Sequence, residues 1–154
     1  MKTLRCVFIG KSGVGKTSIL RIASNDTTRV LPTIGIDNTL FDYKHTFVQA
    51  WDTSGADKFK SVSKLFIEKS RLCIYVYDAA TPDTYEPENI PTNAIVVANV
   101  TQRGSTPIEP THIPVNIKKK RTINNLLDAM IAHAVIEHNS ADTRNASTEC
   151  CCCS

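Results

Sequence analysis

Apolar residues along the chain fall into short runs separated by polar loops, and the runs follow two different spacings. Continuous or alternating apolar stretches of strand length occupy residues 4–9, 36–41, 46–51, 72–77 and 94–100. Apolar residues three or four positions apart, which share one side of a helix, mark residues 18–23, 59–69 and 123–137. We expect a doubly wound α/β sheet, which binds ligands at the carboxyl ends of its strands.

The connections carry information of their own. Residues 25–32 are polar and rich in turn formers, so they predict a mobile connection, and residues 42–45 predict a hairpin loop although they contain no glycine. Residues 78–92 and 102–114 each contain three prolines, which oppose long helices. Both of these intervals are expected to be poor in helix, and a short apolar run at 115–117 follows the second.

Length and composition exclude several classes of protein. The chain has 154 residues, which predicts one domain at 1–137 and a flexible tail at 138–154. A hydrophobic fraction of 42%, a charged fraction of 21% and a net charge of +3 describe an ordinary globular protein and give no reason to expect nucleic-acid binding. No apolar run approaches the roughly 18 residues of a membrane span, and no secretory signal is visible, so we expect a cytosolic chain.

The six cysteines do not predict a disulfide framework. Four of them are contiguous at 150–153, and adjacent residues cannot join distant loops. Cys6 and Cys73 lie within apolar runs, where a buried free thiol is expected.

The N-terminal strand and helix are joined by a phosphate-binding motif. Gly10-Lys11-Ser12-Gly13-Val14-Gly15-Lys16-Thr17 fits the pattern G-x-x-x-x-G-K-[ST]. Glycines let the backbone curl so that its N–H groups face a phosphate, and the helix that follows adds the positive end of its dipole. Lys16 would reach the β- and γ-phosphates of a nucleoside triphosphate, and the Thr17 hydroxyl would ligate Mg²⁺. The alternative is a glycine-containing turn that matches by chance.

A second candidate motif ends the strand at 46–51. In Trp51-Asp52-Thr53-Ser54-Gly55 the aspartate suits a Mg²⁺ ion held through water, and Gly55 could offer its N–H to a γ-phosphate. A plain strand-ending turn is the alternative, and the position one hairpin after the phosphate loop favours the functional interpretation.

With these motifs the chain resembles a small GTPase of the Ras superfamily, and specifically a Rab, over most of residues 1–137. A third stretch, Thr33-Ile34-Gly35-Ile36-Asp37, supports the resemblance. It implies a membrane-anchored switch in vesicle trafficking that binds GTP or GDP with Mg²⁺ on the cytoplasmic face of endomembranes, and that is cytosolic when extracted. The nucleotide-binding residues that it implies in the first half are Ser12, Gly13, Val14, Gly15, Lys16, Thr17 and Ser18.

The resemblance also assigns roles to the second and third motifs. Thr33 becomes the switch I threonine on Mg²⁺ and γ-phosphate, while Asp52 and Gly55 begin switch II. Lys16, Thr33 and Gly55 are the implied catalytic positions, and Thr17, Thr33 and Asp52 the implied metal site. Rab-type effectors and regulators would bind switch II and a surface made of Ile34, Gly35, Ile36 and Asp37.

The C-terminal Cys150-Cys151-Cys152-Cys153-Ser154 is similar to a prenylation signal. In a Rab, Cys150 and Cys151 would carry two geranylgeranyl chains, whereas a C-a-a-X interpretation modifies Cys151 and, with Ser154 last, favours farnesyl. Two lipids would give a stable membrane anchor, since one chain alone binds weakly. The alternative is a disordered tail whose cysteines are accidental or bind metal.

The sequence departs from the Rab pattern at chemically important positions. Ala56 stands where a Rab has the glutamine that orients the attacking water, which predicts very slow intrinsic hydrolysis. The guanine motif N-K-x-D appears as Asn99-Val100-Thr101-Gln102, so a neutral amide replaces the carboxylate acceptor and guanine selectivity should be weaker. The second base motif, S-A-K, appears as Asn116-Ile117-Lys118 and keeps the lysine.

Two helices of the family pattern are missing from the proline-containing intervals. Parallel sheets are normally covered on both faces, so a partner, the tail or a rearranged loop must cover the exposed face, or the protein is poorly stable. We expect a monomer unless that face is paired.

Three functions are compatible with these residues. The first is the membrane-anchored switch with impaired hydrolysis. The second is a non-cycling relative that acts as a binding module or decoy for Rab partners, which Ala56, Gln102 and the missing helices favour. A kinase or ATPase built on the same loop ranks last, because no catalytic carboxylate or lid motif accompanies it.

Overall fold

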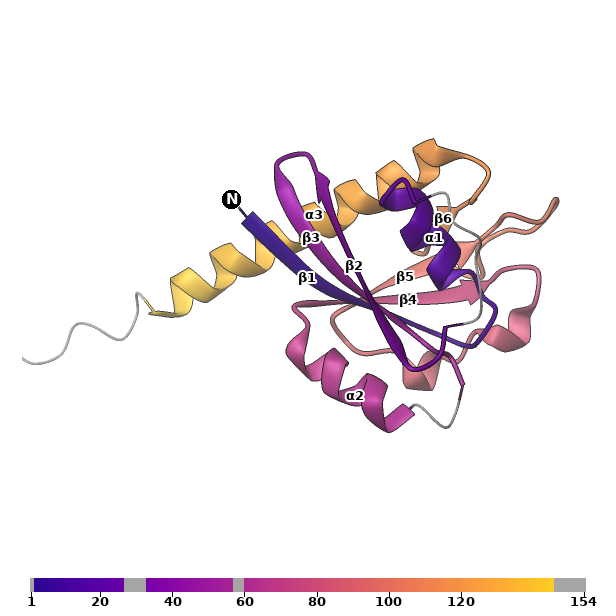
Figure 1. Cartoon of the computed structure of the whole chain (residues 1–154), viewed down its shortest axis with the longest axis horizontal. Helices are drawn as coiled ribbons and strands as arrows, with labels where there is room; N and C mark the ends of the chain where they lie inside the picture. The colour runs from indigo at the N-terminus through magenta and orange to yellow at the C-terminus, as the bar shows by residue number, and fades with distance from the viewer. Residues whose placement is uncertain (1, 27–32, 57–59, 146–154) are drawn as a thin grey trace, which may run out of the picture.

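A six-stranded sheet with helices on both faces organises the chain (Figure 1). The computed structural model describes residues 2–26, 33–56 and 60–145. Within these, the strand order is β2-β3-β1-β4-β5-β6, with β2 antiparallel to β3 and all other neighbouring pairs parallel. The strands are β1 (Lys2–Ile9), β2 (Ile36–Tyr43), β3 (Thr46–Thr53), β4 (Leu72–Asp78), β5 (Ala94–Asn99) and β6 (Ile113–Val115). The predicted α/β sheet is therefore confirmed.

The β2–β3 hairpin turns through Lys44 and His45. Their φ angles are 45° and 62°, the left-handed conformation that both central residues of a type I′ turn require. A hairpin loop without glycine is confirmed. Lys44 also pairs with Asp128 of the C-terminal helix, at 2.7 Å, so the turn is tied to the body of the domain.

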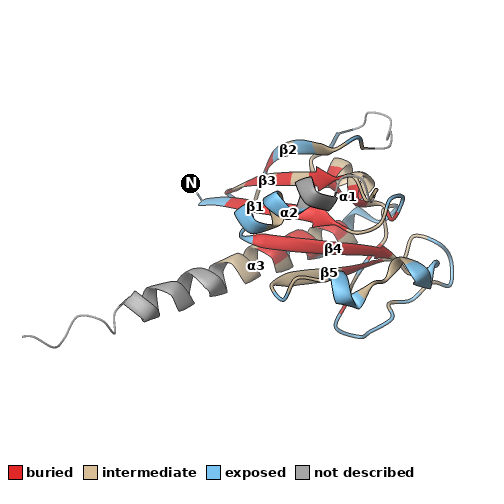
Figure 2. Ribbon diagram, turned by 90° about the horizontal axis from the view of Figure 1, so that it is seen from below, coloured by how far each residue is buried: buried red, intermediate tan, exposed pale blue. Residues whose placement is uncertain are grey.

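One face of the sheet is covered by two helices, α1 (Lys16–Ala23) and α3 (Lys120–Asn145). Their apolar sides meet alternate residues of the strands, and this layer contains the larger hydrophobic core (Figure 2). Its fully buried members from the helices and central strands include Phe8, Ile19, Leu20, Ile74, Ile123, Leu126 and Met130. The face that these helices cover is thus closed by the periodic segments that the sequence predicts.

The opposite face is covered differently. Helix α2 (Lys60–Lys69) packs there through Phe66 and Ile67, but between β4 and β5 the described chain forms only two short 3-10 helices, η2 (Pro82–Thr84) and η3 (Pro87–Asn89). Between β5 and β6 the described residues form no helix. The absence of two helices that the proline-rich intervals predict is confirmed.

A rearranged loop takes the place of those helices over part of this face. Tyr85, between η2 and η3, packs its ring 5.0 Å from Tyr77 of β4 and 5.3 Å from His112, which precedes β6. His112 is buried, and its Nδ1 lies 3.0 Å from the Tyr77 hydroxyl. Because the Tyr77 hydroxyl accepts the Ile108 N–H at 2.8 Å, its own proton is free to go to His112. Both loops are therefore joined over β4 by an aromatic and hydrogen-bonded cluster.

Some boundaries differ from expectation. The last strand, Ile113–Val115, begins ahead of the apolar run at 115–117, and Pro114 is accommodated there because β6 is an edge strand, where the missing N–H costs no ladder bond. The last helix runs from Lys120 to Asn145, longer at both ends than the predicted 123–137, and it enters the segment predicted as a tail. The predicted domain boundary after residue 137 stays a prediction, and residues 27–32 and 57–59 lie outside the described part of the chain.

Cys6 and Cys73 are free and buried, and burial raises the pKa of both thiols, that of Cys73 to about 11. Among the helices of the described residues, none is both long enough and apolar enough to cross a membrane.

Candidate nucleotide-binding site

The phosphate-binding motif lies between β1 and α1, as its sequence predicts. Gly15 is the N-cap of α1 with φ of 102°, a conformation that L side chains rarely adopt. A Cβ atom at Gly15 would also lie 2.6 Å from the Nδ2 atom of Asn99. The glycine therefore permits both the turn into the helix and the close approach of the β5 end.

A cavity of about 280 Å³ opens above this loop at the carboxyl edge of the sheet. Its walls come from the loop, the first turn of α1, Thr33 and the residues that follow β3. The lining residues are Ser12, Gly13, Gly15, Lys16, Thr17, Ser18, Thr33, Thr53, Ser54 and Gly55. The structure thus brings together the residues of all three motifs from the first half of the chain, while the Val14 side chain is buried in the core.

Lys16 is buried at the base of this cavity. Its Nζ donates hydrogen bonds to the carbonyl oxygens of Gly10 and Lys11, both at 2.8 Å, and the residue is 5% exposed. Burial lowers the pKa of Lys16 to about 8, while the charge of Asp52 acts in the opposite direction. A poorly solvated ammonium group in this position is well suited to an anionic ligand.

Asp52, Thr17 and Thr33 form a cluster of oxygen atoms beside Lys16. Both threonine hydroxyls donate to Oδ2 of Asp52, Thr33 at 2.9 Å, and the two hydroxyl oxygens lie 2.9 Å apart. The three oxygen atoms therefore make three close contacts with one another, but only two hydroxyl hydrogens are available to form hydrogen bonds between them. Burial raises the pKa of Asp52, and hydrogen bonds from Thr17 and Thr33 and the charge of Lys16 counteract this.

The oxygen cluster fits a hard divalent cation. Oδ1 of Asp52 is buried and has no hydrogen-bond partner among the described residues, and the cluster has one hydrogen too few for its contacts. A Mg²⁺ ion would satisfy both deficits, since it prefers carboxylate and hydroxyl oxygens and retains several waters. In the described part of the chain no group of three or more His, Cys, Asp or Glu could hold a metal.

The segment after β3 lies directly against the phosphate loop. A Cβ atom on Gly55 would fall 2.1 Å from the Ser12 nitrogen and 2.2 Å from the Lys11 carbonyl carbon, so only glycine fits. Ser54 donates its N–H to the Gly35 carbonyl at 2.7 Å, which joins this segment to the stretch that contains Thr33. Ala56 follows with a methyl side chain that offers neither a donor nor an acceptor.

The base motifs meet at the ends of β5 and β6. Asn99 donates through Nδ2 to the Val14 carbonyl at 2.9 Å and accepts the Thr101 hydroxyl at 2.6 Å. Thr101 in turn accepts the Ile117 N–H at 3.0 Å, and Asn116 Oδ1 accepts the Lys118 N–H at 2.9 Å. Asn99, Gln102 and Lys118 do not line the phosphate cavity, and Gln102 and Lys118 are exposed.

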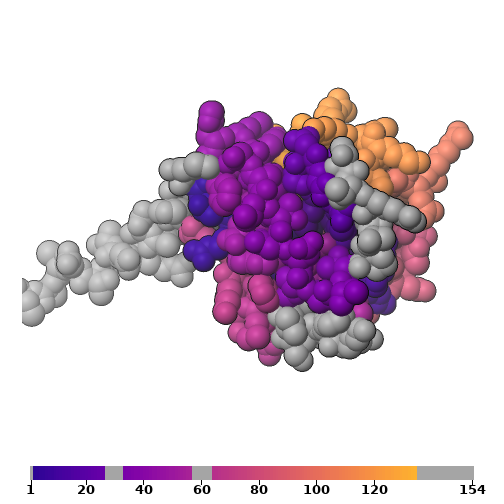
Figure 3. Space-filling model, in the orientation of Figure 1, coloured from indigo at the N-terminus to yellow at the C-terminus, as the bar shows by residue number. Residues whose placement is uncertain are grey.

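The residues predicted as an effector surface are partly exposed to solvent. Ile34 is 86% exposed, the largest exposure among the described large apolar side chains, and Leu40 on β2 is also exposed. In the space-filling view the segment that contains β2 and β3 covers the centre of the visible face, with α2 below it (Figure 3). Cys150 and Cys151 lie outside the described residues.

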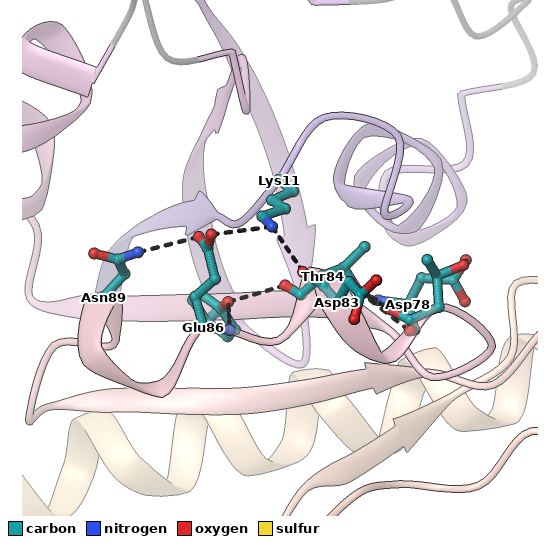
Figure 4. Close-up of polar contacts among 8 residues, drawn as sticks. Lys11, Asp78, Asp83, Thr84, Glu86 and Asn89 are labelled. Carbon is teal, nitrogen blue, oxygen red and sulfur yellow. Dashed lines mark hydrogen bonds and ion pairs between the residues drawn. The ribbon is translucent and has the colours of Figure 1, made fainter.

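Sequence reasoning missed the contacts of Lys11. Its Nζ donates to the Asp83 carbonyl at 2.7 Å and pairs with Glu86 at 3.0 Å, so the phosphate loop is bound to the segment that contains η2 and η3 (Figure 4). The two partners are 72 and 75 positions away, and no periodicity or motif joins them. The sequence shows only that Lys11 occupies an unspecified position of the phosphate-loop pattern and that Glu86 lies in a proline-rich interval, and neither fact predicts their contact.

Comparisons with known proteins agree with the geometry. Residues 5–108 match the family model "Ras of Complex, Roc, domain of DAPkinase". Rab-7B of Dictyostelium discoideum is 36% identical over 84 residues, which cover 54% of this chain and 43% of that protein. RabC of the same organism is 34% identical over 90 residues (53% and 46%), and RABG1 of Arabidopsis thaliana is 30% identical over 142 residues (87% and 66%).

The chain therefore spans between 43% and 66% of the length of these three relatives. The family match nevertheless covers well over half of the chain and includes the phosphate loop, Thr33 and the Asp52–Gly55 segment. Together with the α/β sheet and the cavity at its carboxyl edge, these matches identify the chain as a Rab-like small GTPase of the Ras superfamily.

Proposed function

We propose that this chain binds guanine nucleotides with Mg²⁺ and acts as a membrane-anchored switch in vesicle trafficking, with very slow intrinsic hydrolysis. The proposal depends on one observation: the hydroxyls of Thr17 and Thr33 both hydrogen-bond to Asp52, next to the buried Lys16. These residues come from separate segments of the chain. A ligand that binds all of them would fix the Thr33 segment relative to the phosphate loop, which is what a nucleotide-dependent switch needs.

Each residue of the phosphate cavity has a chemical task in this proposal. Backbone N–H groups of the loop and the start of α1 would bind the phosphates, with Ser18 near the α-phosphate end, and Lys16 would supply a full positive charge. Thr17 and Thr33 would hold Mg²⁺ directly and Asp52 through water. Bound Mg²⁺ would neutralise charge on the β- and γ-phosphates.

Slow hydrolysis follows from the residue after Gly55. Lys16, Thr33 and Gly55 retain the positions that stabilise and orient the γ-phosphate, but the attacking water also needs a positioned partner. The methyl group of Ala56 cannot hydrogen-bond to water. The lifetime of the triphosphate state would then depend on nucleotide exchange or on a partner that supplies the missing group.

The base and the cellular partners belong to the same proposal. Asn99, Gln102 and Lys118 would surround the base, with weak selectivity for guanine because Gln102 carries no charge.

Effectors and regulators would bind the exposed Ile34 and its neighbours to Asp37, together with switch II. Lipids on Cys150 and Cys151 would attach the chain to the cytoplasmic face of endomembranes. The protein would act as a monomer.

One observation favours a second candidate function. Because Ala56 removes the water-orienting group, a protein that binds nucleotide but never hydrolyses it would serve as a non-cycling binding module or decoy for Rab partners. The two functions share the site and differ only in turnover.

The copurified nucleotide and its turnover test both functions. Mass spectrometry of the purified full chain should find GTP or GDP; ATP would show that guanine recognition is lost, and the absence of nucleotide would contradict the nucleotide binding that both functions share. Single-turnover hydrolysis should be very slow in the wild type and about tenfold or more faster in Ala56→Gln, since a loss of correct positioning can cost roughly 10²-fold in rate. Ala132→Gln, an exposed site on α3, is the matched control and should not change the rate. A wild-type rate equal to that of Ala56→Gln would contradict slow hydrolysis.

Membrane attachment needs its own test. Incubation of the full chain with prenyltransferases and prenyl diphosphates should raise the intact mass by two prenyl groups, and the double variant Cys150→Ser/Cys151→Ser should lose this increase. An unchanged mass of the wild type would contradict the anchor.

A further inference from the structure

The side chain of Lys11 faces a neighbouring cavity and not the phosphate cavity. This second cavity, of about 410 Å³, shares Thr53, Ser54 and Gly55 with the first and is also lined by Glu86 and Asn89. Lys11 Nζ lies 3.0 Å from Glu86 Oε1, and Asn89 Nδ2 donates to Glu86 Oε2 at 3.0 Å (Figure 4). Both carboxylate oxygens of Glu86 are thus engaged.

The segment that holds Lys11 is itself firmly placed. Tyr75 of β4 donates its hydroxyl to the Thr84 carbonyl at 3.1 Å and accepts the Glu86 N–H at 2.8 Å. Thr84 accepts the N–H of Asp78 at 2.9 Å. The backbone around Glu86 is therefore fixed to a central strand of the sheet, and Glu86 offers Lys11 a stationary partner.

The main chain of Lys11 contributes to the phosphate cavity from the other side. Its carbonyl accepts the Lys16 ammonium at 2.8 Å, and the peptide between Lys11 and Ser12 lies against Gly55. Any displacement of Lys11 therefore moves an acceptor of Lys16, the Ser12 N–H and the wall that Gly55 contacts. One side chain thus connects the position of the phosphate loop to the segment that replaces a missing helix.

We propose that the ion pair between Lys11 and Glu86 is a positioning contact that holds the phosphate loop in its binding conformation and so slows nucleotide release. This inference depends on the proposed nucleotide binding. A loop that is already placed loses less freedom when the ligand binds, and such gains are observed mostly as slower dissociation. The pair is partly exposed, 41% for Lys11 and 32% for Glu86, so its effect is moderate and weakened by salt.

The test measures release of a fluorescent GDP analogue from the full chain in the presence of Mg²⁺. Glu86→Gln and Lys11→Met should each release it about threefold to fivefold faster, the range expected for a partly exposed pair. The double variant Lys11→Met/Glu86→Gln should be no faster than either single variant, because both changes remove the same contact. The ratio of variant to wild-type rates should decrease between 50 mM and 500 mM salt, because the Debye length falls from roughly 14 Å to roughly 4 Å over this range and the ion pair is screened more strongly.

Glu88→Gln is the matched control, because Glu88 lies in η3, two residues after Glu86 at its N-cap, carries the same charge and is exposed. It should leave the release rate unchanged. Equal rates for Glu86→Gln and Glu88→Gln, or additive effects in the double variant, would overturn the inference. A wild-type chain that binds no nucleotide would instead contradict the proposed function. If Glu86→Gln unfolds, the single variant Lys11→Met carries the test, and an unchanged release rate for it would also overturn the inference.

Discussion

The phosphate end and the base end of the site are built by different means. At the phosphate end, glycines and buried polar groups determine the geometry: only glycine fits at Gly15 and Gly55, and Lys16 and Asp52 are buried. At the base end, Gln102 and Lys118 are exposed side chains on loops after β5 and β6. The first end depends on backbone shape, whereas the second depends on the identity of individual side chains.

The base end also shows which motif residues the fold itself needs. Asn99 bonds to the Val14 carbonyl and accepts from Thr101, and Asn116 accepts the Lys118 N–H, so both asparagines hold loops together. Val100 and Gln102 stand where the family pattern has lysine and aspartate, and neither side chain hydrogen-bonds to another described residue. In the first base motif, Asn99 supports the fold and is retained, whereas the two positions that would serve only the base have changed; the second base motif keeps its exposed lysine, Lys118.

Lys16→Ala should produce the largest loss of affinity at the phosphate end. It removes an ammonium group that is buried among the loop carbonyls, and charge-assisted hydrogen bonds of roughly 1.5–3 kcal/mol each imply a loss of triphosphate affinity of about 100-fold or more. Titration calorimetry with a non-hydrolysable GTP analogue and Mg²⁺ measures the change. Lys69→Ala, an exposed lysine at the end of α2, is the control and should bind like the wild type. Undiminished affinity in Lys16→Ala would place the ligand elsewhere.

Asp52→Asn tests the contribution of the metal site separately from that of the phosphate loop. The amide keeps the shape but removes the charge that would bind Mg²⁺ through water, and outer-sphere changes of this kind typically cost about 10- to 100-fold in metal affinity. The gain in nucleotide affinity on addition of Mg²⁺ should therefore shrink by that factor, as measured by titration with and without EDTA. Asp42→Asn, an exposed position on β2, controls for loss of charge. An Asp52→Asn chain with a full Mg²⁺ response would exclude Asp52 from the metal site.

The two ends also differ in how far the sequence could predict them. The positions of Lys16, Thr17 and Gly55 follow from motifs that fix backbone geometry, and the α/β fold class follows from the alternation of elements that surrounds them. The sequence could not predict that Tyr85 and His112 would cover β4, because this packing joins two loops with no periodic pattern. The pairing of Lys11 with Glu86 was equally invisible, since partners in irregular segments meet only through the completed fold.

Gln102→Asp should increase the selectivity for guanine at the base end. A carboxylate accepts two hydrogen bonds from guanine more strongly than an amide oxygen, and a difference of about 1.4 kcal/mol corresponds to a tenfold rise in preference for GDP over ADP. Competition of the two nucleotides against a fluorescent analogue measures the preference. Gln49→Asp tests whether a new negative charge elsewhere on the domain has the same effect, and it should leave the preference unchanged. An unaltered preference in Gln102→Asp would show that this loop does not reach the base.

The smallest expected effect is a pH dependence that belongs to the phosphate end alone. Burial lowers the pKa of Lys16 to about 8, and bound phosphates favour its charged form, so binding above pH 8 must take up a proton. Affinity for a triphosphate should therefore fall about fourfold between pH 7 and pH 8.5, the ratio of the charged fractions of a group with that pKa. Lys16→Ala should show a flat profile over the same range, while Gln102→Asp should keep the wild-type slope, because the base end contains no group involved in this equilibrium. A wild-type affinity that stayed constant to pH 8.5 would mean that the Lys16 ammonium is charged throughout, and that its contribution to binding does not depend on the burial that distinguishes the phosphate end.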